Sequence, residues 1–214
     1  MGLAIAIITA FWLCIIIYDP VKVFDKVITE DNLSKVMMVP KTDLQIAAKS
    51  LTEFVLGETE SYVSPMVRQK DDIVEFVTGD EIGHLQDVRN LFKTVKITAI
   101  VLSFVCVVCF FALFFTKRRC LAFGMLFGGL AALLVLTVLV IFGLTNTFGF
   151  ETAFHSLVFK GGNYQFDKGS SLLVRLFSDT FYKEVIKCVA FSGAPVLTLQ
   201  VSAALLWLKK WGKC

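Results

Sequence analysis

The stretch that decides the fold is ITAIVLSFVCVVCFFALFF, residues 97–115, which contains no charged side chain. A helix needs roughly 20 apolar residues to cross a bilayer core of about 30 Å. Three more uncharged runs occur, at residues 3–18, 120–142 and 188–208. They account for a chain that is 56% hydrophobic. This pattern excludes soluble globular and disordered proteins, and also outer-membrane barrels, whose strands alternate apolar and polar residues.

The distribution of charge predicts the orientation of these runs in the membrane. Basic residues without acidic neighbours stand between the second and third runs and after the fourth: Lys117, Arg118, Arg119, Lys209, Lys210 and Lys213. Every Asp and Glu lies in residues 19–96 or 143–187. The positive-inside rule therefore predicts four transmembrane helices with both termini cytoplasmic. The net charge of +3 reflects this asymmetry and does not indicate a nucleic-acid partner.

We expect a membrane α-helical fold with a small extracellular α+β cap, divided along the chain as follows. The transmembrane helices are residues 1–18, 95–115, 120–142 and 185–208; the cap is 19–94, the cytoplasmic loop 116–119, an aromatic-rich extracellular loop 143–184, and the cytoplasmic tail 209–214. The first run lacks a basic n-region and a small-x-small cleavage site, so we interpret it as a retained helix rather than a signal peptide.

Within the cap, residues 21–28, 35–39 and 73–77 have the β-branched character of short strands. Residues 42–56 have apolar side chains at three- and four-residue steps, which predicts a helix. Thr42 is its expected N-cap, and Gly57 is expected to end it.

Thr78-Gly-Asp-Glu81 is a capping box, and the helix that it opens is expected to run on into the second span. In the fourth span, Gln200 is expected to bond a neighbouring helix. The two outer segments, which are the expected extracellular residues 19–94 and 143–184, contain no cysteine. The Cys106 and Cys109 pair lies within a span. Because nothing there lowers a thiol pKa, we interpret these cysteines as packing residues.

The second outer segment is unusually aromatic. Its phenylalanines are Phe148, Phe150, Phe154, Phe159, Phe166, Phe177 and Phe181. A loop surrounded by water has little use for so many apolar rings. We expect it to dip into the membrane interface or to cover the outer mouth of the bundle.

The chemistry available outside the membrane centres on His84 and His155, the two histidines of the chain. Histidine is the side chain best suited to proton transfer near neutral pH. On helices, Asp87 would lie three residues after His84, and Glu151 four residues before His155. Both histidines could instead be ordinary interface residues, or could bind a metal with Asp87 or Glu151. No serine-hydrolase elbow, P-loop or dinucleotide fingerprint is present.

Two motifs around these histidines resemble those of the bacterial lipoprotein intramolecular transacylase family. The first is Glu81-Ile-Gly-His84-Leu-Gln-Asp87-Val; the second is Phe154-His155-Ser-Leu-Val-Phe159 followed by Asn163-Tyr-Gln-Phe166-Asp167. The resemblance covers nearly the whole chain. Tyr164 stands where Trp is expected, and Lys168 where Pro is expected, which concerns the contacts with lipid more than the chemistry.

The resemblance implies an intramolecular acyl transfer in the bacterial plasma membrane, at its extracellular face. The substrate would be a lipoprotein whose N-terminal cysteine carries a diacylglyceryl group, and the product its lyso form. The sn-2 acyl chain would move from the glycerol ester to the cysteine α-amine. His84 and His155 would be catalytic, with Asp87, Glu151, Asn163, Tyr164 and Asp167 as supporting or substrate-binding candidates. Membrane lipid is the other expected partner, and no cofactor or metal is expected.

The residues suit this chemistry. A histidine with a pKa of about 6.5 can take a proton from an α-ammonium group with a pKa of about 8. Tethering of donor and acceptor in one molecule supplies about 7–11 kcal/mol of the barrier, so few catalytic groups are required. We favour His155 as the base and Asp87 as the residue that orients His84. Candidate oxyanion donors are Asn163, the backbone of residues 161–162, and a protonated His84.

Two other functions fit the same features. One is a non-catalytic membrane sensor or partner-binding protein whose histidines respond to pH. The other is an outer-leaflet lipid or lipoprotein hydrolase. Mass separates hydrolysis from transfer, because hydrolysis removes an acyl chain whereas transfer leaves the lipoprotein mass unchanged. Fragmentation of the N-terminal lipopeptide separates transfer from no reaction.

Overall fold

The computed structural model describes residues 12, 19–159, 166–167 and 169–211. The chain divides into two compact units. The membrane unit comprises residues 1–18, 96–145 and 186–214, and the cap unit comprises residues 19–95 and 146–185. Each unit is described by itself below.

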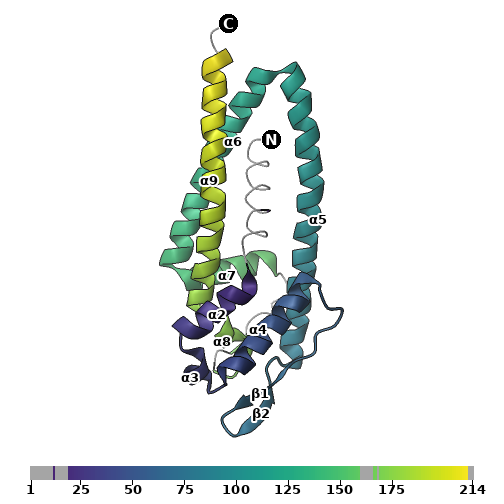
Figure 1. The fold of residues 1–214 in the computed structure, drawn as a ribbon, viewed down its shortest axis with the longest axis vertical. Coiled ribbons are helices and arrows are strands. Elements are labelled where there is room, and N and C mark those ends of the chain that lie inside the picture. Colours follow the sequence, from purple (N-terminus) through teal and green to yellow (C-terminus); the bar gives the residue numbers. More distant parts are fainter. Residues whose placement is uncertain (1–11, 13–18, 160–165, 168, 212–214) are drawn as a thin grey trace. The chain divides into compact units, whose positions relative to one another are not determined.

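Three of the described helices are long and apolar enough to cross a membrane (Figure 1): α5 (Gly79–Thr116), α6 (Arg118–Thr145) and α9 (Asp179–Trp211). Each contains one of the predicted spans 95–115, 120–142 and 185–208. Lys117 alone separates α5 from α6. The first predicted span lies outside the described residues except for Trp12.

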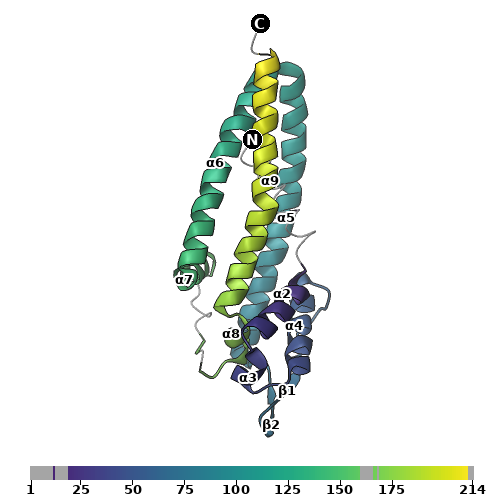
Figure 2. The ribbon, with the colours of Figure 1, turned by 60° about the vertical axis from the view of Figure 1, so that its left-hand side comes forward.

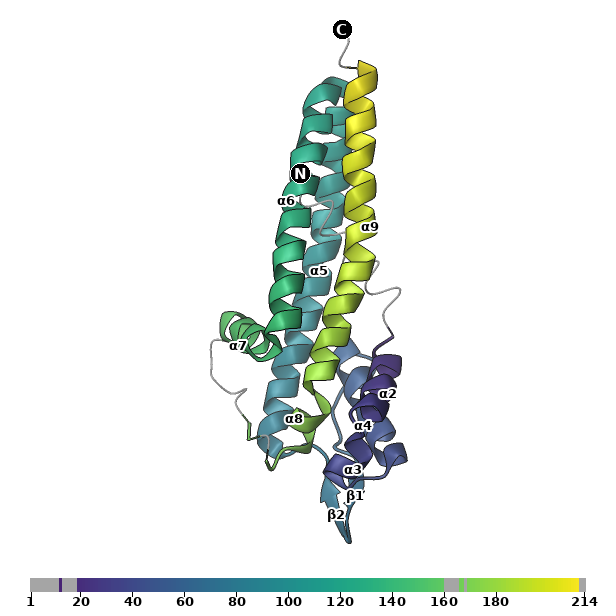
Figure 3. The same ribbon diagram turned by 90° about the vertical axis from the view of Figure 1, so that its left-hand side faces the viewer.

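Within the membrane unit, α6 and α9 lie side by side, as Figures 2 and 3 show. The Gln200 side chain donates from Nε2 to the main-chain oxygen of Met125 on α6, at 3.0 Å, which confirms the prediction that Gln200 bonds a neighbouring helix. Gly129 permits the close approach, because a Cβ atom there would lie 2.7 Å from Cγ2 of Val201. Trp12 Nε1 donates to Ser103 Oγ of α5 at 3.2 Å, so this residue of the first apolar run contacts the second run.

The cap unit begins with helices where residues 21–28 and 35–39 were expected to form strands, so that expectation is wrong. These helices are α2 (Pro20–Glu30) and α3 (Leu33–Met37). The Asp19 carboxylate caps α2 by accepting hydrogen bonds from the backbone N–H groups of residues 21 and 22, and Pro20 is preorganised for the first turn. Phe24, Val27 and Ile28 recur at helical spacing and are buried, so the burial of this stripe overrides β propensity.

Helix α4 (Lys41–Leu56) confirms the helix expected at residues 42–56. Its N-cap is Pro40 rather than Thr42, and no side chain caps the first turn. Gly57 ends the helix with φ of 84°, as expected, because this left-handed backbone suits glycine. Leu44, Leu51 and their apolar neighbours on α4 are buried against α2, so these helices form the centre of the cap.

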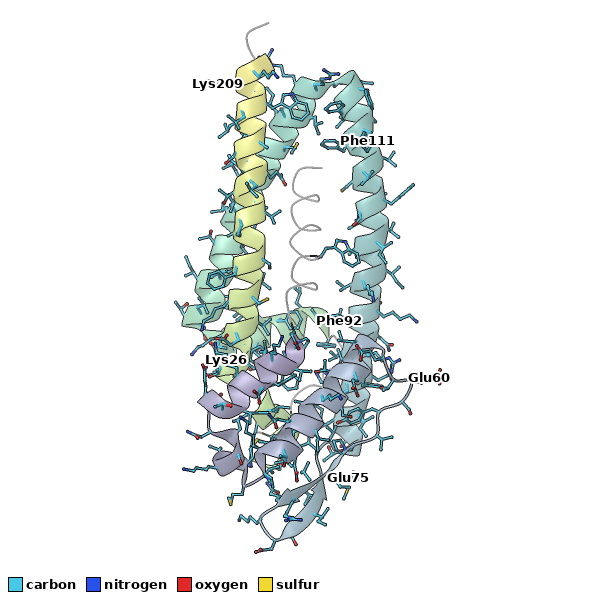
Figure 4. All side chains as sticks on the ribbon, in the orientation of Figure 1. Lys26, Glu60, Glu75, Phe92, Phe111 and Lys209 are labelled. Atoms are coloured by element: carbon cyan, nitrogen blue, oxygen red, sulfur yellow. The ribbon has the colours of Figure 1, made fainter. Side chains whose placement is uncertain are left out.

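A two-stranded antiparallel hairpin completes this part of the cap. Strand β1 (Met66–Gln69) pairs with β2 (Asp72–Glu75), and Met66 stands opposite Glu75, which Figure 4 labels. The strand expected at residues 73–77 is therefore present but shifted, and its partner β1 was not predicted. Val67 of β1 is buried in the same core as α4.

The second outer segment folds onto the same unit. It contains α7 (Thr147–Val158), α8 (Leu172–Leu176) and the first residues of α9. The leucines of α8 join the cap core: Leu172, Leu173 and Leu176. Lys26 of α2, labelled in Figure 4, forms an ion pair of 2.7 Å with Glu184 of α9. These contacts bring the two outer segments of the sequence into one structure, and each segment contributes one histidine.

Candidate active site

The first turn of α5 fixes the position of His84. One of the two hydrogen bonds of the predicted capping box forms, since the backbone N–H of Thr78 donates to the Glu81 carboxylate at 2.7 Å, and the Thr78 hydroxyl donates to the same oxygen. Leu85 is buried in the cap core and anchors this part of the helix. His84, next to Leu85, is half-buried at the edge of that core.

Helix α7 fixes the position of His155. The Asn146 side chain caps α7 by accepting a hydrogen bond from the backbone N–H of Gly149 at 3.0 Å. Only Asn146 separates α6 from α7, so the chain leaves one helix and begins the next at once. His155 lies in the last turn of α7 and is partly buried.

The structure brings His84 and His155 together. Their ring centroids are 5.9 Å apart and the ring planes are inclined by 32°. Phe159 contacts both rings, with its centroid 4.9 Å from that of His84 and 5.6 Å from that of His155. Phe166 approaches His84 edge-on at 6.0 Å. The two imidazoles therefore form a pair that the rings of Phe159 and Phe166 contact.

The main chain selects the tautomer of His155. Its Nδ1 lies 2.9 Å from the carbonyl oxygen of Glu151, one turn earlier in α7. A carbonyl oxygen only accepts hydrogen bonds, so Nδ1 must bear a proton and donate it. Neutral His155 then has its lone pair on Nε2. A base needs such a lone pair, and this geometry supplies it.

Burial and like charge hold His84 in its neutral form. Burial lowers the pKa of His84, and a positive charge on nearby His155 would lower it further. The Asp87 carboxylate acts in the opposite direction and raises this pKa, with the smallest effect of the three. Among the described residues, Asp87 makes no hydrogen bond to the His84 ring. Its influence on His84 is therefore through its charge.

The Glu151 carboxylate faces a residue that the sequence did not suggest. Burial, then the charge and hydrogen bonding of Glu151, raise the pKa of the Tyr182 phenol. Tyr182 lies ahead of the predicted span 185–208, in the first turns of α9. Glu151 thus reaches His155 through its backbone and Tyr182 through its side chain. Its helical spacing could predict the first contact, but no sequence signal indicates the second.

The remaining candidates come from the segment after α7. Asp167 is exposed, and its carboxylate accepts hydrogen bonds from the backbone N–H and the hydroxyl of Ser170, both at 3.1 Å. Hydrogen bonds from Gly169 and Ser170 lower the pKa of Asp167. Asp167 therefore organises the turn that leads into α8. Asn163 and Tyr164 lie outside the described residues.

Phe159 and Phe166 were expected as part of an aromatic loop and of the second motif, without an assigned role, and they contact the histidine pair. The four-residue step from His155 to Phe159 is a signal that the sequence does contain. Among the described residues, no group of three His, Cys, Asp or Glu side chains could hold a metal ion. The groups that the described site offers are thus two imidazoles and their aromatic surroundings.

Comparisons with known proteins identify a family and a similar fold. The sequence matches the family model "Lipoprotein intramolecular transacylase Lit" over residues 1–182. No curated protein sequence matches significantly. The structure is similar to that of the membrane-integral lipoprotein intramolecular transacylase Lit from Bacillus cereus, with a TM-score of 0.71 and 13% identity over 98% of this chain and 94% of that one.

Two variants of the Bacillus cereus protein, with one histidine replaced by Arg or by Ala, give TM-scores of 0.69 and 0.68 at 13% and 14% identity. They cover 98% of this chain and 89% and 90% of theirs. At such identities the structures establish the fold alone, that of a multi-pass membrane protein. The family is established by the match of the sequence to the family model over most of its length. The chain belongs to the lipoprotein intramolecular transacylase family.

Proposed function

We propose that the chain moves the sn-2 acyl chain of a diacylglyceryl lipoprotein to the α-amine of that lipoprotein's N-terminal cysteine. The observation that carries the proposal is the pairing of His84 and His155, 5.9 Å apart, against Phe159. Donor ester and acceptor amine belong to one molecule, so positioning supplies much of the rate and two imidazoles suffice for proton transfer. The product is the lyso-form lipoprotein, with one N-acyl and one O-acyl chain.

In this mechanism His155 moves the proton. The neutral amine attacks the ester carbonyl carbon, and a C–N bond forms. Nε2 of His155 takes the proton that the nitrogen loses, and then gives it to the glycerol oxygen as the C–O bond breaks. The hydrogen bond from Nδ1 to the Glu151 carbonyl supports this role, because it leaves Nε2 as the acceptor. Atoms balance without water or a cofactor.

His84 has a different role, as a neutral hydrogen-bond donor. Its lowered pKa disfavours the protonated form that was one of the candidates for stabilising the oxyanion. A neutral imidazole still offers one N–H group, which can donate to the oxygen on which negative charge develops. The charge of Asp87 acts weakly against this role, because it raises the pKa of His84. Asn163 and the backbone of residues 161–162 remain further candidates.

The site faces the extracellular side in this proposal, with four spans and both termini in the cytoplasm. The clusters at residues 117–119 and 209–213 support this orientation, because basic residues favour the cytoplasmic side. The substrate's acyl chains would enter from the outer leaflet. The exposed side chains of Phe154 and Leu157 on α7 offer apolar surface beside His155.

The test replaces each histidine by Ala in full-length protein reconstituted with a diacylglyceryl lipopeptide. Removal of an acid–base group should slow N-acylation by roughly 100- to 10,000-fold. Ser156→Ala, next to His155 on the exposed side of α7, is the matched control and should keep wild-type activity. Fragmentation mass spectrometry locates the acyl chain on nitrogen or oxygen. Unchanged N-acylation in both histidine variants would contradict the mechanism, and a loss of one acyl mass would identify a hydrolase.

A further inference from the structure

The first turn of α5 contains a buried carboxylate that the proposed reaction does not use. Glu81 is only 2% exposed. Its Oε2 accepts hydrogen bonds from the backbone N–H of Thr78 at 2.7 Å and from the Thr78 hydroxyl at 2.9 Å. Its Oε1 accepts a hydrogen bond from the hydroxyl of Ser171, which lies ninety residues later in the sequence. A buried carboxylate requires such donors, and here one donor comes from the other outer segment.

Ser171 links Glu81 to the segment that carries Phe166, one of the rings that contact His84. Its Oγ also accepts from the backbone N–H of Val174 at 3.0 Å and so caps α8. Its own backbone N–H donates to the carbonyl oxygen of Asp167 at 3.0 Å. Phe166 immediately precedes Asp167, and its ring contacts His84. These contacts therefore connect Glu81 with His84, one turn later in α5, through Ser171, Asp167 and Phe166.

We propose that Glu81 is a positioning residue of the active site, which holds the described residues of this segment, Phe166, Asp167 and Ser171, on α5 and thereby keeps the Phe166 ring against His84. Glu81 touches neither substrate nor reacting atoms in this role. The ring excludes water from one side of the imidazole. The proposal rests on the proposed function only in that it takes His84 to be a catalytic residue.

Chemical labelling of the imidazole tests the proposal without any need for catalysis. Diethyl pyrocarbonate carbethoxylates neutral imidazoles, and the chain has only two histidines, so peptide mass spectrometry assigns each site. The full chain is labelled in lipid nanodiscs at about pH 8, well above the ordinary pKa of a histidine side chain. In Glu81→Gln the amide has one acceptor oxygen fewer, so a buried donor loses its partner. The label should enter His84 roughly tenfold faster, since the segment opens more often.

Asp80→Asn is the matched control. It removes the same charge from the adjacent residue, whose side chain is exposed. It should label His84 at the wild-type rate. Equal labelling of His84 in folded Glu81→Gln and wild-type protein would overturn the proposal. Faster labelling in both variants would also overturn it, because loss of charge alone would then be the cause.

Ser171 provides the second arm, which remains informative if Glu81→Gln does not fold. Ser171→Ala should speed labelling of His84, and Ser171→Thr, which retains the hydroxyl, should restore the wild-type rate. If Glu81 acts through Ser171, His84 in the double variant Glu81→Gln, Ser171→Ala should be labelled no faster than in the faster of the two single variants. Labelling at the product of the two single effects would refute this route, as would a wild-type rate in Ser171→Ala.

The pH dependence of activity separates a positioning role of Glu81 from a simple loss of stability. The acid limb is the part of the pH–activity profile in which activity falls as the pH decreases. The charged or titratable groups that act on His84 are His155 of α7 and Asp87 of its own helix. Neither changes in Glu81→Gln, whereas burial of the ring decreases, so the acid limb should move to higher pH. A lower melting temperature with unmoved labelling and acid limb would mean that Glu81 only stabilises the fold. If wild-type protein performs no acyl transfer, the proposed function fails, but the labelling experiment still decides the role of Glu81.

Discussion

Phe159 is the side chain whose removal should most directly disturb the histidine pair. Its ring meets His84 at 4.9 Å and an interplanar angle of 67°, and His155 at 5.6 Å and 35°. An aromatic pair contributes about 0.5–1.5 kcal/mol beyond the area that it buries. Loss of two such contacts in Phe159→Ala removes about 1–3 kcal/mol of restraint on the two rings, or roughly 5- to 150-fold in the population of the paired geometry. We expect the rate of acyl transfer to fall by a factor in this range.

The same variant should change the dependence of activity on pH. Burial is the largest cause of the lowered pKa of His84, and the Phe159 ring supplies part of that burial. In Phe159→Ala the pKa of His84 therefore rises toward its ordinary value of about 6.5. Because the mechanism needs neutral His84, activity is lost as the pH falls through this pKa. The acid limb should consequently move to higher pH than in wild-type protein.

The assay measures N-acylated lipopeptide by fragmentation mass spectrometry in reconstituted protein, from about pH 5 to pH 9, the range in which histidine titrates. Phe148→Ala is the control, because it removes the same ring from α7 at a position that is 65% exposed. It should leave both the rate at neutral pH and the acid limb in place. A Phe159→Ala protein with wild-type rate and an unmoved acid limb would falsify the assignment of Phe159 as a wall of the site.

Three further predictions concern charge, helix packing and the core. In Asp87→Asn, loss of the charge that raises the pKa of His84 should lower that pKa further, so a pH–activity profile should show the acid limb at lower pH. Gly129→Ala places a Cβ atom 2.7 Å from the nearest side-chain atom of α9 and should cost about 1–3 kcal/mol in thermal unfolding, whereas Gly124→Ala, with nothing within 4 Å, should not. Leu44→Ala should lower the free energy of unfolding by about 2–5 kcal/mol, measured by denaturant titration, because Leu44 is fully buried in the cap.

Elements that depend on local signals could be predicted from the sequence. Glu81 of the predicted capping box accepts from the backbone N–H of Thr78, and the helix that begins there runs without a break into the apolar residues of α5. Gly57 ends α4 because its φ of 84° suits a residue without a side chain. In both cases the residues that determine the structure stand within one turn of the boundary that they set.

The expectations that failed concern segments in which local preferences for strand and for other structure compete. In residues 21–28 the β-branched residues suggested a strand, but Asp19 and Pro20 had already supplied a helix start, and the apolar stripe fits a helix. Strand β1 was not predicted, because Met66–Gln69 gains its partner only through the turn at Lys70, which has φ of 55°. Burial against α4 decides these segments, and such burial is a property of the folded unit rather than of a window of sequence.

The candidate site likewise has features that local sequence signals predicted and features that depend on the folded structure. Helical spacing placed Asp87 and Glu151 near the histidines, and they are near, but it did not predict which atoms act. Glu151 contacts His155 through its carbonyl oxygen and directs its carboxylate to Tyr182. The approach of His84 to His155 joins the two outer segments, and no spacing rule links residues so distant. That pairing was expected only through the resemblance of the two motifs to a family.

The carbonyl partner of His155 has a consequence for redesign of the protein. A hydrogen bond to the main chain survives exchange of the side chain that the main chain bears, provided that α7 stays helical. Position 151 can therefore accept an uncharged, helix-favouring residue without loss of the tautomer that the base requires. A search for functional sequences, natural or designed, should accordingly demand a helix around His155 and leave the identity of residue 151 open.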